Sequence, residues 1–261
     1  MPFSLDTLGT LLSWTNDRGE ELLFPQGQIT IGGQQKLRGG AHVCAPIFGT
    51  QPKTSPYEGV NLPQHGLVRV SGSSATQRAF SSLGGFECRV FSFDANEVFP
   101  WSHEVLVKVS EDDFGNTLHH ELAVGDTGLD RHGRPMPLSM GVHPYFATRG
   151  QPFEVGVTHE DGIRNLHCAE LAAGKSVYIP RNGFWMQVDL RCSGGVVMVS
   201  IAAERNFEGG YTGINLWSDS FDRYLCIEPV LGRDRDGKPD PVYLEPGEGC
   251  TCRCSFKFSA T

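Results

Sequence analysis

Four short segments of the chain carry the residue types that acid–base chemistry needs. They are LRGG at 37–40, LPQHGLVR at 62–69, GVHPYF at 141–146 and CIEP at 226–229. Histidine exchanges protons readily near neutral pH, and a carboxylate partly removed from water is a base with a pKa closer to neutrality. His143 and Glu228 are therefore candidates for an acid–base pair. The spacing alone leaves open that His143 is an ordinary surface or hydrogen-bonded histidine, one of nine in the chain.

Arginines in the first two segments add a way of holding an oxygen-rich ligand. The guanidinium group is a planar fork of donors that suits hydroxyl, carboxylate or phosphate oxygens, and Arg38 and Arg69 supply two of them. A histidine, a glutamate and an arginine converging in one groove form an acid–base site without a metal ion. Prolines and glycines beside these residues fix the backbone, which suits side chains held at the ends of strands.

The elements that must position these residues are predicted to be strands. Alternation of apolar and polar residues marks 87–93, 103–110, 119–124, 152–157, 186–190 and 250–258, and apolar runs mark 196–202 and 223–227. Turn-forming residues are abundant, with 32 glycines and 16 prolines, and helical periodicity over 11 or more residues is absent. We predict an all-β fold, a large antiparallel β-sandwich formed by residues 1–261 as a single domain.

Composition and charge exclude several classes of partner. The formal net charge is −8 without a run of lysine or arginine, so a nucleic acid is not expected as a ligand. No stretch approaches the roughly 18 apolar residues of a membrane span, and the first residues do not resemble a signal peptide. We therefore expect a cytoplasmic protein whose eight cysteines are reduced thiols. The sequence gives no indication of oligomeric state.

Some other clusters have a structural interpretation that we prefer to a functional one. Cys250, Cys252 and Cys254 project to one face of a strand, but a second pair of zinc ligands is not visible, which favours core packing. His119 and His120 point to opposite faces and cannot share a metal. Residues 233–236 (RDRD) are interpreted as a solvated turn, and the ring of Trp217 could stack on the apolar face of a ligand or pack in the core.

The order of the motifs resembles the aldose 1-epimerase (mutarotase) superfamily. RGG with PIFG, LPQHG-x-x-R, GVHPYF and IEP occur here in the order found in that superfamily, over roughly residues 38–228. LPQHG followed by Arg69, together with RGG, resembles the hexose-6-phosphate 1-epimerase branch in particular. The resemblance implies a β-sandwich with an open groove and no metal or organic cofactor.

The resemblance also implies roles for individual residues. His143 would act as the general acid toward the ring oxygen of the sugar, and Glu228 as the general base toward the anomeric hydroxyl. His65 would bind the substrate, and Arg38 and Arg69 would hold hydroxyls or a phosphate. The expected ligand is a small molecule, a hexose or hexose 6-phosphate whose α and β anomers are interconverted.

Two departures from the branch pattern keep alternatives open. The branch has a tryptophan shortly after HG-x-x-R, where this chain reads VSGSS at 70–74, and an aspartate before a strand tyrosine, where it reads KSVY at 175–178. Asp189 could substitute only if the alignment slips. The chain is thus an epimerase, a non-catalytic carbohydrate-binding protein on the same fold, or an interaction domain that keeps the motifs for packing.

Overall fold

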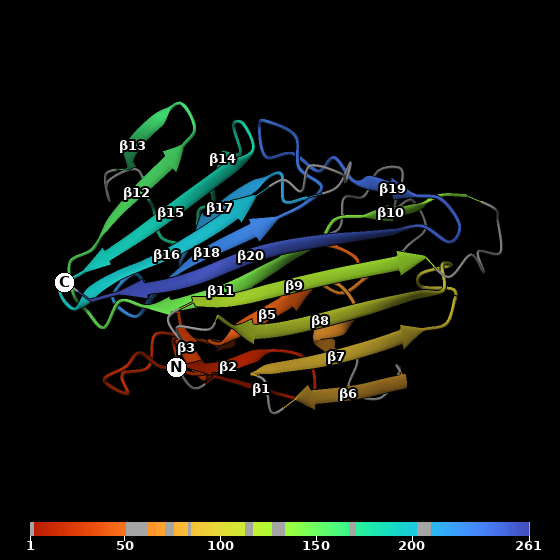
Figure 1. Ribbon diagram of the computed structural model, residues 1–261, viewed down its shortest axis with the longest axis horizontal. Helices are drawn as coiled ribbons and strands as arrows, with labels where there is room; N and C mark the ends of the chain where they lie inside the picture. Colours follow the sequence, from red (N-terminus) through yellow and green to blue (C-terminus); the bar gives the residue numbers. More distant parts are fainter. Residues whose placement is uncertain are drawn as a thin grey trace.

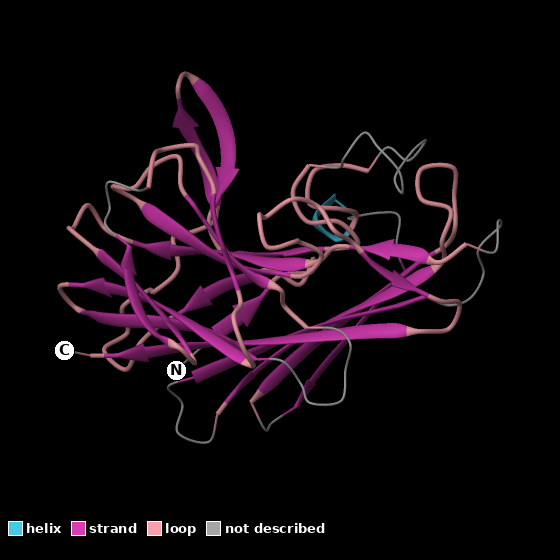
Figure 2. Cartoon of the chain, turned by 90° about the horizontal axis from the view of Figure 1, so that it is seen from above, coloured by secondary structure: helices cyan, strands magenta, loops and turns pink. Residues whose placement is uncertain are grey.

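The computed structural model describes residues 3–50, 62–70, 76–82, 85–112, 117–126, 134–166, 171–202 and 210–260. These residues form antiparallel strands and one turn of 3₁₀ helix, η1 (Val68–Val70). The strands lie mainly in two large sheets packed face to face (Figures 1 and 2). The predicted all-β antiparallel sandwich is confirmed. No helix in the described part of the chain is long and apolar enough to cross a membrane.

The first sheet carries the motifs that the sequence analysis singled out. Its seven described strands have the order β1-β2-β5-β11-β18-β17-β14. Their bounds are β1 (Phe3–Leu5), β2 (Leu11–Trp14), β5 (Ala41–Cys44), β11 (Gly141–Ala147), β14 (Val177–Pro180), β17 (Gly213–Trp217) and β18 (Tyr224–Val230). The neighbours β5, β11 and β18 lie far apart in sequence, so this sheet brings distant motifs side by side.

The second sheet supplies the other half of the sandwich. Its nine described strands have the order β13-β12-β15-β16-β20-β9-β8-β7-β6. Their bounds are β6 (Thr76–Ser82), β7 (Phe86–Phe93), β8 (His103–Glu111), β9 (Thr117–Asp126), β12 (Glu154–His159), β13 (Gly162–Leu166), β15 (Trp185–Cys192), β16 (Gly195–Ala202) and β20 (Gly249–Ser259). The remaining strands form two pairs, β3 (Gly27–Ile31) with β4 (Gln34–Arg38) and β10 (Met136–Leu138) with β19 (Val242–Leu244).

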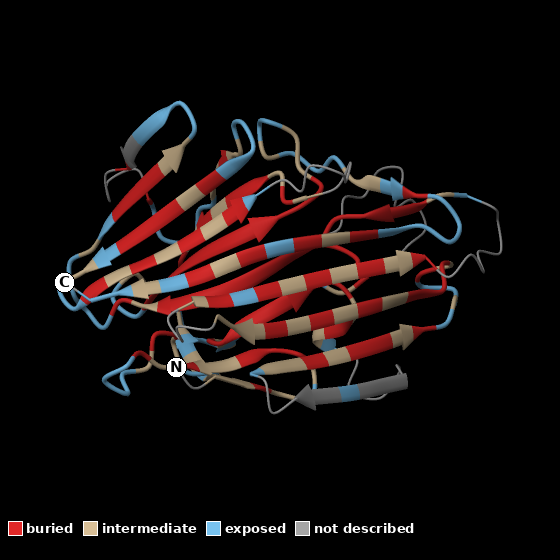
Figure 3. Cartoon of the chain, in the orientation of Figure 1, coloured by how far each residue is buried: buried red, intermediate tan, exposed pale blue. Residues whose placement is uncertain are grey.

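Period-two alternation decides which side chains face the core between the sheets. In the first sheet, Val142 and Phe146 of β11 and Ile227 of β18 belong to the buried core. The Phe146 ring meets that of Phe256 on β20 edge-on, with centroids 5.6 Å apart, which joins the two sheets. Strands β7, β8, β9 and β20 show the same alternation of buried and less buried residues (Figure 3). The residues between the core positions of the first sheet face the other way.

Prolines interrupt the pairing of β11 with β18 near the predicted site. The paired residues are Gly141↔Val230, Tyr145↔Cys226, Phe146↔Leu225 and Ala147↔Tyr224. The register is the same at both ends of the gap, which contains Pro144 and Pro229, and neither proline has an N–H to give to the ladder. Both strands continue through the prolines. His143 and Glu228 therefore lie within central strands, which corrects the expectation that they lie at strand ends.

The structural interpretation of the cysteine and histidine clusters is confirmed. Cys250, Cys252 and Cys254 lie on one strand and are buried as part of the apolar core. His119 and His120 occupy opposite faces of β9, because His119 is exposed while His120 is fully buried.

His120 gives a prediction for stability. Burial lowers its pKa to about 4, below the ordinary value of about 6.5, so folding favours the neutral ring. The stability contributed by this neutral ring is complete above about pH 6.5 and is lost as the pH falls toward 4. Between pH 7 and pH 4.5, the free energy of unfolding should fall by about 2 to 3 kcal/mol less in His120→Leu than in wild type. Urea unfolding at both pH values measures this difference.

His119→Leu is the matched control, because it makes the same substitution at the neighbouring, exposed position of β9. Equal losses of unfolding free energy in wild type and His120→Leu would contradict the prediction.

Candidate active site

A row of four polar side chains crosses the centre of the first sheet. Asn215 lies opposite Glu228, and His143 lies opposite His42. The register of β11 with β18, which is equal on both sides of the proline gap, places His143 opposite Glu228. Directly opposed residues of antiparallel strands share a face. The four side chains therefore lie in one row on the face turned away from the core.

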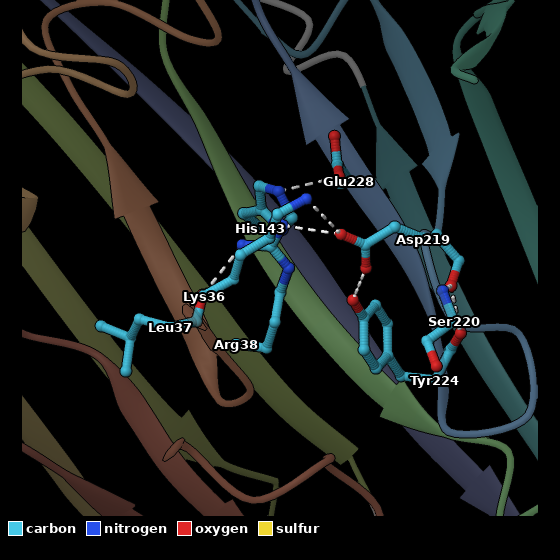
Figure 4. Close-up of polar contacts among 9 residues, drawn as sticks. Lys36, Leu37, Arg38, His143, Asp219, Ser220, Tyr224 and Glu228 are labelled. Atoms are coloured by element: carbon cyan, nitrogen blue, oxygen red, sulfur yellow. Dashed lines mark hydrogen bonds and ion pairs between the residues drawn. The ribbon is translucent and has the colours of Figure 1, made fainter. Parts of the chain in front are cut away.

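His143 and Glu228 are in direct contact at the middle of this row. Nε2 of His143 lies 3.1 Å from Oε1 of Glu228, and the two side chains are only 6% and 2% exposed (Figure 4). Burial raises the pKa of Glu228 to about 8, against the opposing effects of Asn215 and Arg233. Burial, helped by the charges of neighbouring groups that include His65, holds the pKa of His143 well below its ordinary value. Burial thus favours the form in which both groups are uncharged.

Asn215 determines which oxygen of Glu228 meets the histidine. Its Nδ2 donates a hydrogen bond of 2.7 Å to Oε2 of Glu228, which leaves Oε1 for His143. This bond favours the charged carboxylate, so it lowers the pKa of Glu228 against the larger effect of burial. The sequence analysis missed Asn215, because only the register of β17 with β18 places it beside Glu228.

His65 is held as a donor of hydrogen bonds. Its backbone has φ 67°, in the left-handed region, just before Gly66, where an added Cβ would meet the carbonyl oxygen of Ala45 at 2.1 Å. The amide of Gly49 donates to Nδ1 of His65 at 3.2 Å, so the proton of the neutral ring sits on Nε2. Burial and, after it, Arg69 lower the pKa of His65 to about 3. The ring of His65 is therefore neutral near pH 7 and can donate a hydrogen bond from Nε2.

A network around Asp219 holds Arg38 over the site (Figure 4). Nη2 of Arg38 donates to Asp219 at 2.7 Å, Nζ of Lys36 lies 3.6 Å from the same oxygen, and the hydroxyl of Tyr224 donates to the other oxygen. The Arg38 guanidinium lies 5.1 Å from the centre of the Trp217 ring, within range of a cation–π interaction. Burial opposes ionisation of Asp219, but the bonds from Arg38 and Tyr224 lower its pKa.

His143, Glu228, Asn215, His65 and Arg38 line a cleft of about 840 Å³. Its described lining is Lys36, Leu37, Arg38, Phe48, Gly49, Thr50, Pro63, Gln64, His65, Arg69, Val70, His143, Tyr145, Ser176, Tyr178, Asn215, Trp217, Glu228, Val230, Arg233 and Gly237. Within that described lining, four side chains are cationic (Lys36, Arg38, Arg69 and Arg233) and Glu228 is the sole carboxylate. The cleft thus favours an anionic ligand although the chain carries a net charge of −8.

The structure brings all five residues predicted for the site to this cleft: Arg38, His65, Arg69, His143 and Glu228. Their chemical roles stay predictions. Trp217 also lines the cleft, which places it where it can meet a ligand.

Two expectations about nearby residues need correction. Arg233 is not part of a solvated turn: it lines the cleft and donates to the carbonyl oxygen of Phe48 at 3.0 Å. Asp189 lies on β15 of the second sheet, where it accepts hydrogen bonds from Gln187 and Arg191. It is not among the described residues that line the cleft, so Asp189 does not replace the missing aspartate.

One group of described residues has the donor atoms of a metal site. One ligand atom each from His143, Cys226 and Glu228 lies within 4.8 Å of the others, and all three residues are buried.

Comparison with known proteins supports the resemblance. No protein-family model matches the chain. Over 92% of this chain and 76% of its relative, the sequence is 28% identical to a protein of Cenchrus ciliaris named "Putative glucose-6-phosphate 1-epimerase". The chain is thus a homologue of a protein named as an isomerase, the class that was predicted.

Two solved structures share the fold. One is a galactose mutarotase related enzyme from Lactobacillus acidophilus, with a TM-score of 0.68, 18% identity and coverage of 99% of this chain and 94% of that one. The other is a galactose mutarotase-like protein from Lactobacillus casei, with a TM-score of 0.70, 15% identity and coverage of 98% and 96%. The predicted galactose mutarotase-like fold is therefore confirmed.

The Asn215–Glu228 contact gives a prediction about the site. Replacing Asn215 by leucine removes a bond that favours the carboxylate, so we expect the pKa of Glu228 in Asn215→Leu to rise further above about 8. A pH titration of the side-chain carboxyl ¹³C resonance, assigned with Glu228→Gln, measures this pKa. Tyr178→Phe is the control, because Tyr178 pairs with Asn215 but its hydroxyl contacts Thr212. A Glu228 pKa unchanged in Asn215→Leu would rule out this role.

Proposed function

We propose that the protein interconverts the α and β anomers of a hexose 6-phosphate, with His143 as general acid and Glu228 as general base. The observation that carries the proposal is the direct contact of 3.1 Å between these two buried groups on the lining of one cleft. The homologue named as a glucose-6-phosphate 1-epimerase and the mutarotase-like fold support the same reaction.

The reaction can be written with the atoms of this site. Protonated His143 gives its Nε2 proton to the ring oxygen O5 while Glu228 takes the proton of the anomeric hydroxyl O1. The C1–O5 bond breaks, and the open-chain aldehyde forms without a charged intermediate. Rotation about C1–C2 presents the other face of the aldehyde, and the two protons return along the same route. Each acid or base of this kind typically contributes a factor of about 10² to 10⁴.

Burial tunes both groups in the direction that the reaction needs. A lowered pKa makes protonated His143 a stronger acid, and a raised pKa makes ionised Glu228 a stronger base. Ring opening converts the charged pair into the neutral pair that burial favours. The two forms hold the same number of protons, so the pair is restored after each turnover without exchange with solvent.

The charges of the cleft favour a sugar phosphate over a free sugar. Four cationic side chains and a single carboxylate lie in its described lining. Arginine suits bidentate contacts with phosphate oxygens, and Arg38 is preorganised by Asp219. The local field matters more than the net charge for attracting an anion. We assign Arg38 and Arg69 to the anionic end of the substrate and the Nε2 proton of His65 to a sugar oxygen.

A cytoplasmic location is part of the proposal. The seven cysteines of the described residues are all free thiols. Free thiols fit a reducing compartment, where a phosphorylated hexose would be found.

Anomer exchange tests the proposed reaction. NMR exchange measurements on glucose 6-phosphate, galactose and glucose should show rapid exchange with wild type and a decrease of about 10² to 10⁴ in kcat for Glu228→Gln and His143→Asn. Asp189→Asn, in the other sheet, serves as the control that retains wild-type exchange. If wild type binds these sugars but exchanges them no faster than buffer does, the protein is a carbohydrate-binding protein on the same fold.

Substrate discrimination tests the role of the arginines. A charge-assisted hydrogen bond contributes about 1.5 to 3 kcal/mol, so Arg69→Gln should raise KM for glucose 6-phosphate by about 10- to 100-fold. The KM for free glucose should change far less, because glucose has no dianionic group. Steady-state kinetics on both sugars measure the difference. Equal increases in the two KM values would show that Arg69 does not contact the phosphate.

A further inference from the structure

Cys226 is a buried thiol that the proposed reaction does not use. It precedes Glu228 by two residues on β18, so both side chains lie on the same face of the strand. Its partner on the neighbouring strand β11 is Tyr145, which follows His143 by two residues. The thiol is fully buried in a cluster with Tyr145 and Tyr224, against which Trp217 packs. Cys226 thus lies on the same face as His143 and Glu228, with its sulfur within 4.8 Å of one atom of each.

The three side chains offer a soft thiolate, a borderline imidazole and a hard carboxylate, ligand types that zinc accepts. One atom of each residue lies within 4.8 Å of the others, and His143 and Glu228 are 3.1 Å apart. A tetrahedral zinc ion bound at about 2.0 to 2.3 Å needs its ligand atoms roughly 3.5 Å apart. Small side-chain rotations therefore bring the three atoms into place. Three protein ligands with one open position are typical of open zinc sites.

The open position would face the cleft, because His143 and Glu228 both line it. Nε2 of His143 and Oε1 of Glu228 would be the ligand atoms. The other carboxylate oxygen, Oε2 of Glu228, is held by Asn215. The other ring nitrogen, Nδ1 of His143, has no hydrogen-bond partner among the described residues. Nothing in these contacts prevents Nε2 and Oε1 from turning to an ion.

Asp219 offsets the positive charges of Arg38 and Lys36, whereas those of Arg69 and Arg233 oppose the binding of a divalent cation. The guanidinium of Arg38 is paired with Asp219 at 2.7 Å, and Lys36 approaches the same carboxylate. Thiol and carboxyl ligands release protons when a metal binds. The two protons released by the thiol of Cys226 and the carboxyl group of Glu228 therefore offset the two positive charges of the ion. A thiolate also selects zinc over hard ions such as magnesium.

We propose that zinc, or another thiophilic divalent ion, binds to His143, Cys226 and Glu228 and blocks the cleft reversibly. The ion occupies the acid and the base together, so it inhibits rather than assists the anomer exchange. The inhibitory effect rests on the proposed function, whereas the binding site does not.

Cobalt(II) is the probe for the site, because a thiolate ligand gives it a sulfur-to-metal charge-transfer absorption. The protein should bind one Co²⁺ per chain with this absorption, and Zn²⁺ should displace it. In Cys226→Ser the absorption should vanish, and the affinity for Zn²⁺ by calorimetry should fall by more than the roughly 10- to 100-fold typical of losing an outer-shell partner. Cys192→Ser is the matched control, because Cys192 lines a separate cavity.

His143→Asn provides a second test that does not depend on the fate of the thiol, since it should also weaken Co²⁺ binding. The absorption persisting in Cys226→Ser, or the absence of stoichiometric Co²⁺ binding by folded wild type, would overturn the proposal. Zinc should abolish anomer exchange by wild type and by Cys192→Ser at concentrations that leave the exchange rate of Cys226→Ser unchanged. Each rate is compared with that of the same protein without zinc. If wild type binds Co²⁺ through sulfur but exchanges no sugar, the metal site stands and the proposed function fails.

Discussion

The register between β11 and β18 is the constraint on which the rest of the site depends. It places His143 opposite Glu228 at the centre of the first sheet and sends Val142 and Ile227 to the core. A slip of one residue would exchange these two sets and bury ionisable groups among apolar ones. The register is kept across two prolines that cannot donate to the ladder. The pairs on both sides of the gap, together with the packed core, therefore hold the acid–base pair in place.

Removal from water then gives this contact its chemistry. In a half-buried or exposed setting, an imidazole and a carboxylate would titrate near their ordinary values. Here burial moves the two pKa values in opposite directions, so His143 is made more acidic and Glu228 more basic. Asn215 limits the shift of Glu228 and fixes its orientation, while His65 is kept neutral with its proton on Nε2. The same confinement brings Cys226 near the pair and makes a metal-binding site possible.

The fold could be predicted from local patterns, because alternation with period two reports directly which residues face a core. The candidate residues were also found, since His143, Glu228, His65 and the arginines stand in distinctive motifs. Asn215 and Asp219 could not be found in this way: their partners are fixed by pairing of distant strands and by contact with the β3–β4 hairpin, which leave no local signal. Arg233 was mistaken for part of a solvated turn because its sequence neighbours are charged.

The crystal structure of Glu228→Gln with glucose 6-phosphate tests the central claim most directly, because this variant is expected to bind the sugar while turning it over far more slowly than wild type. The account predicts the ring oxygen O5 within hydrogen-bond distance of Nε2 of His143 and O1 beside residue 228. It also predicts the phosphate among the arginines of the cleft. A sugar bound with its anomeric carbon away from both residues, or outside the cleft, would contradict the account.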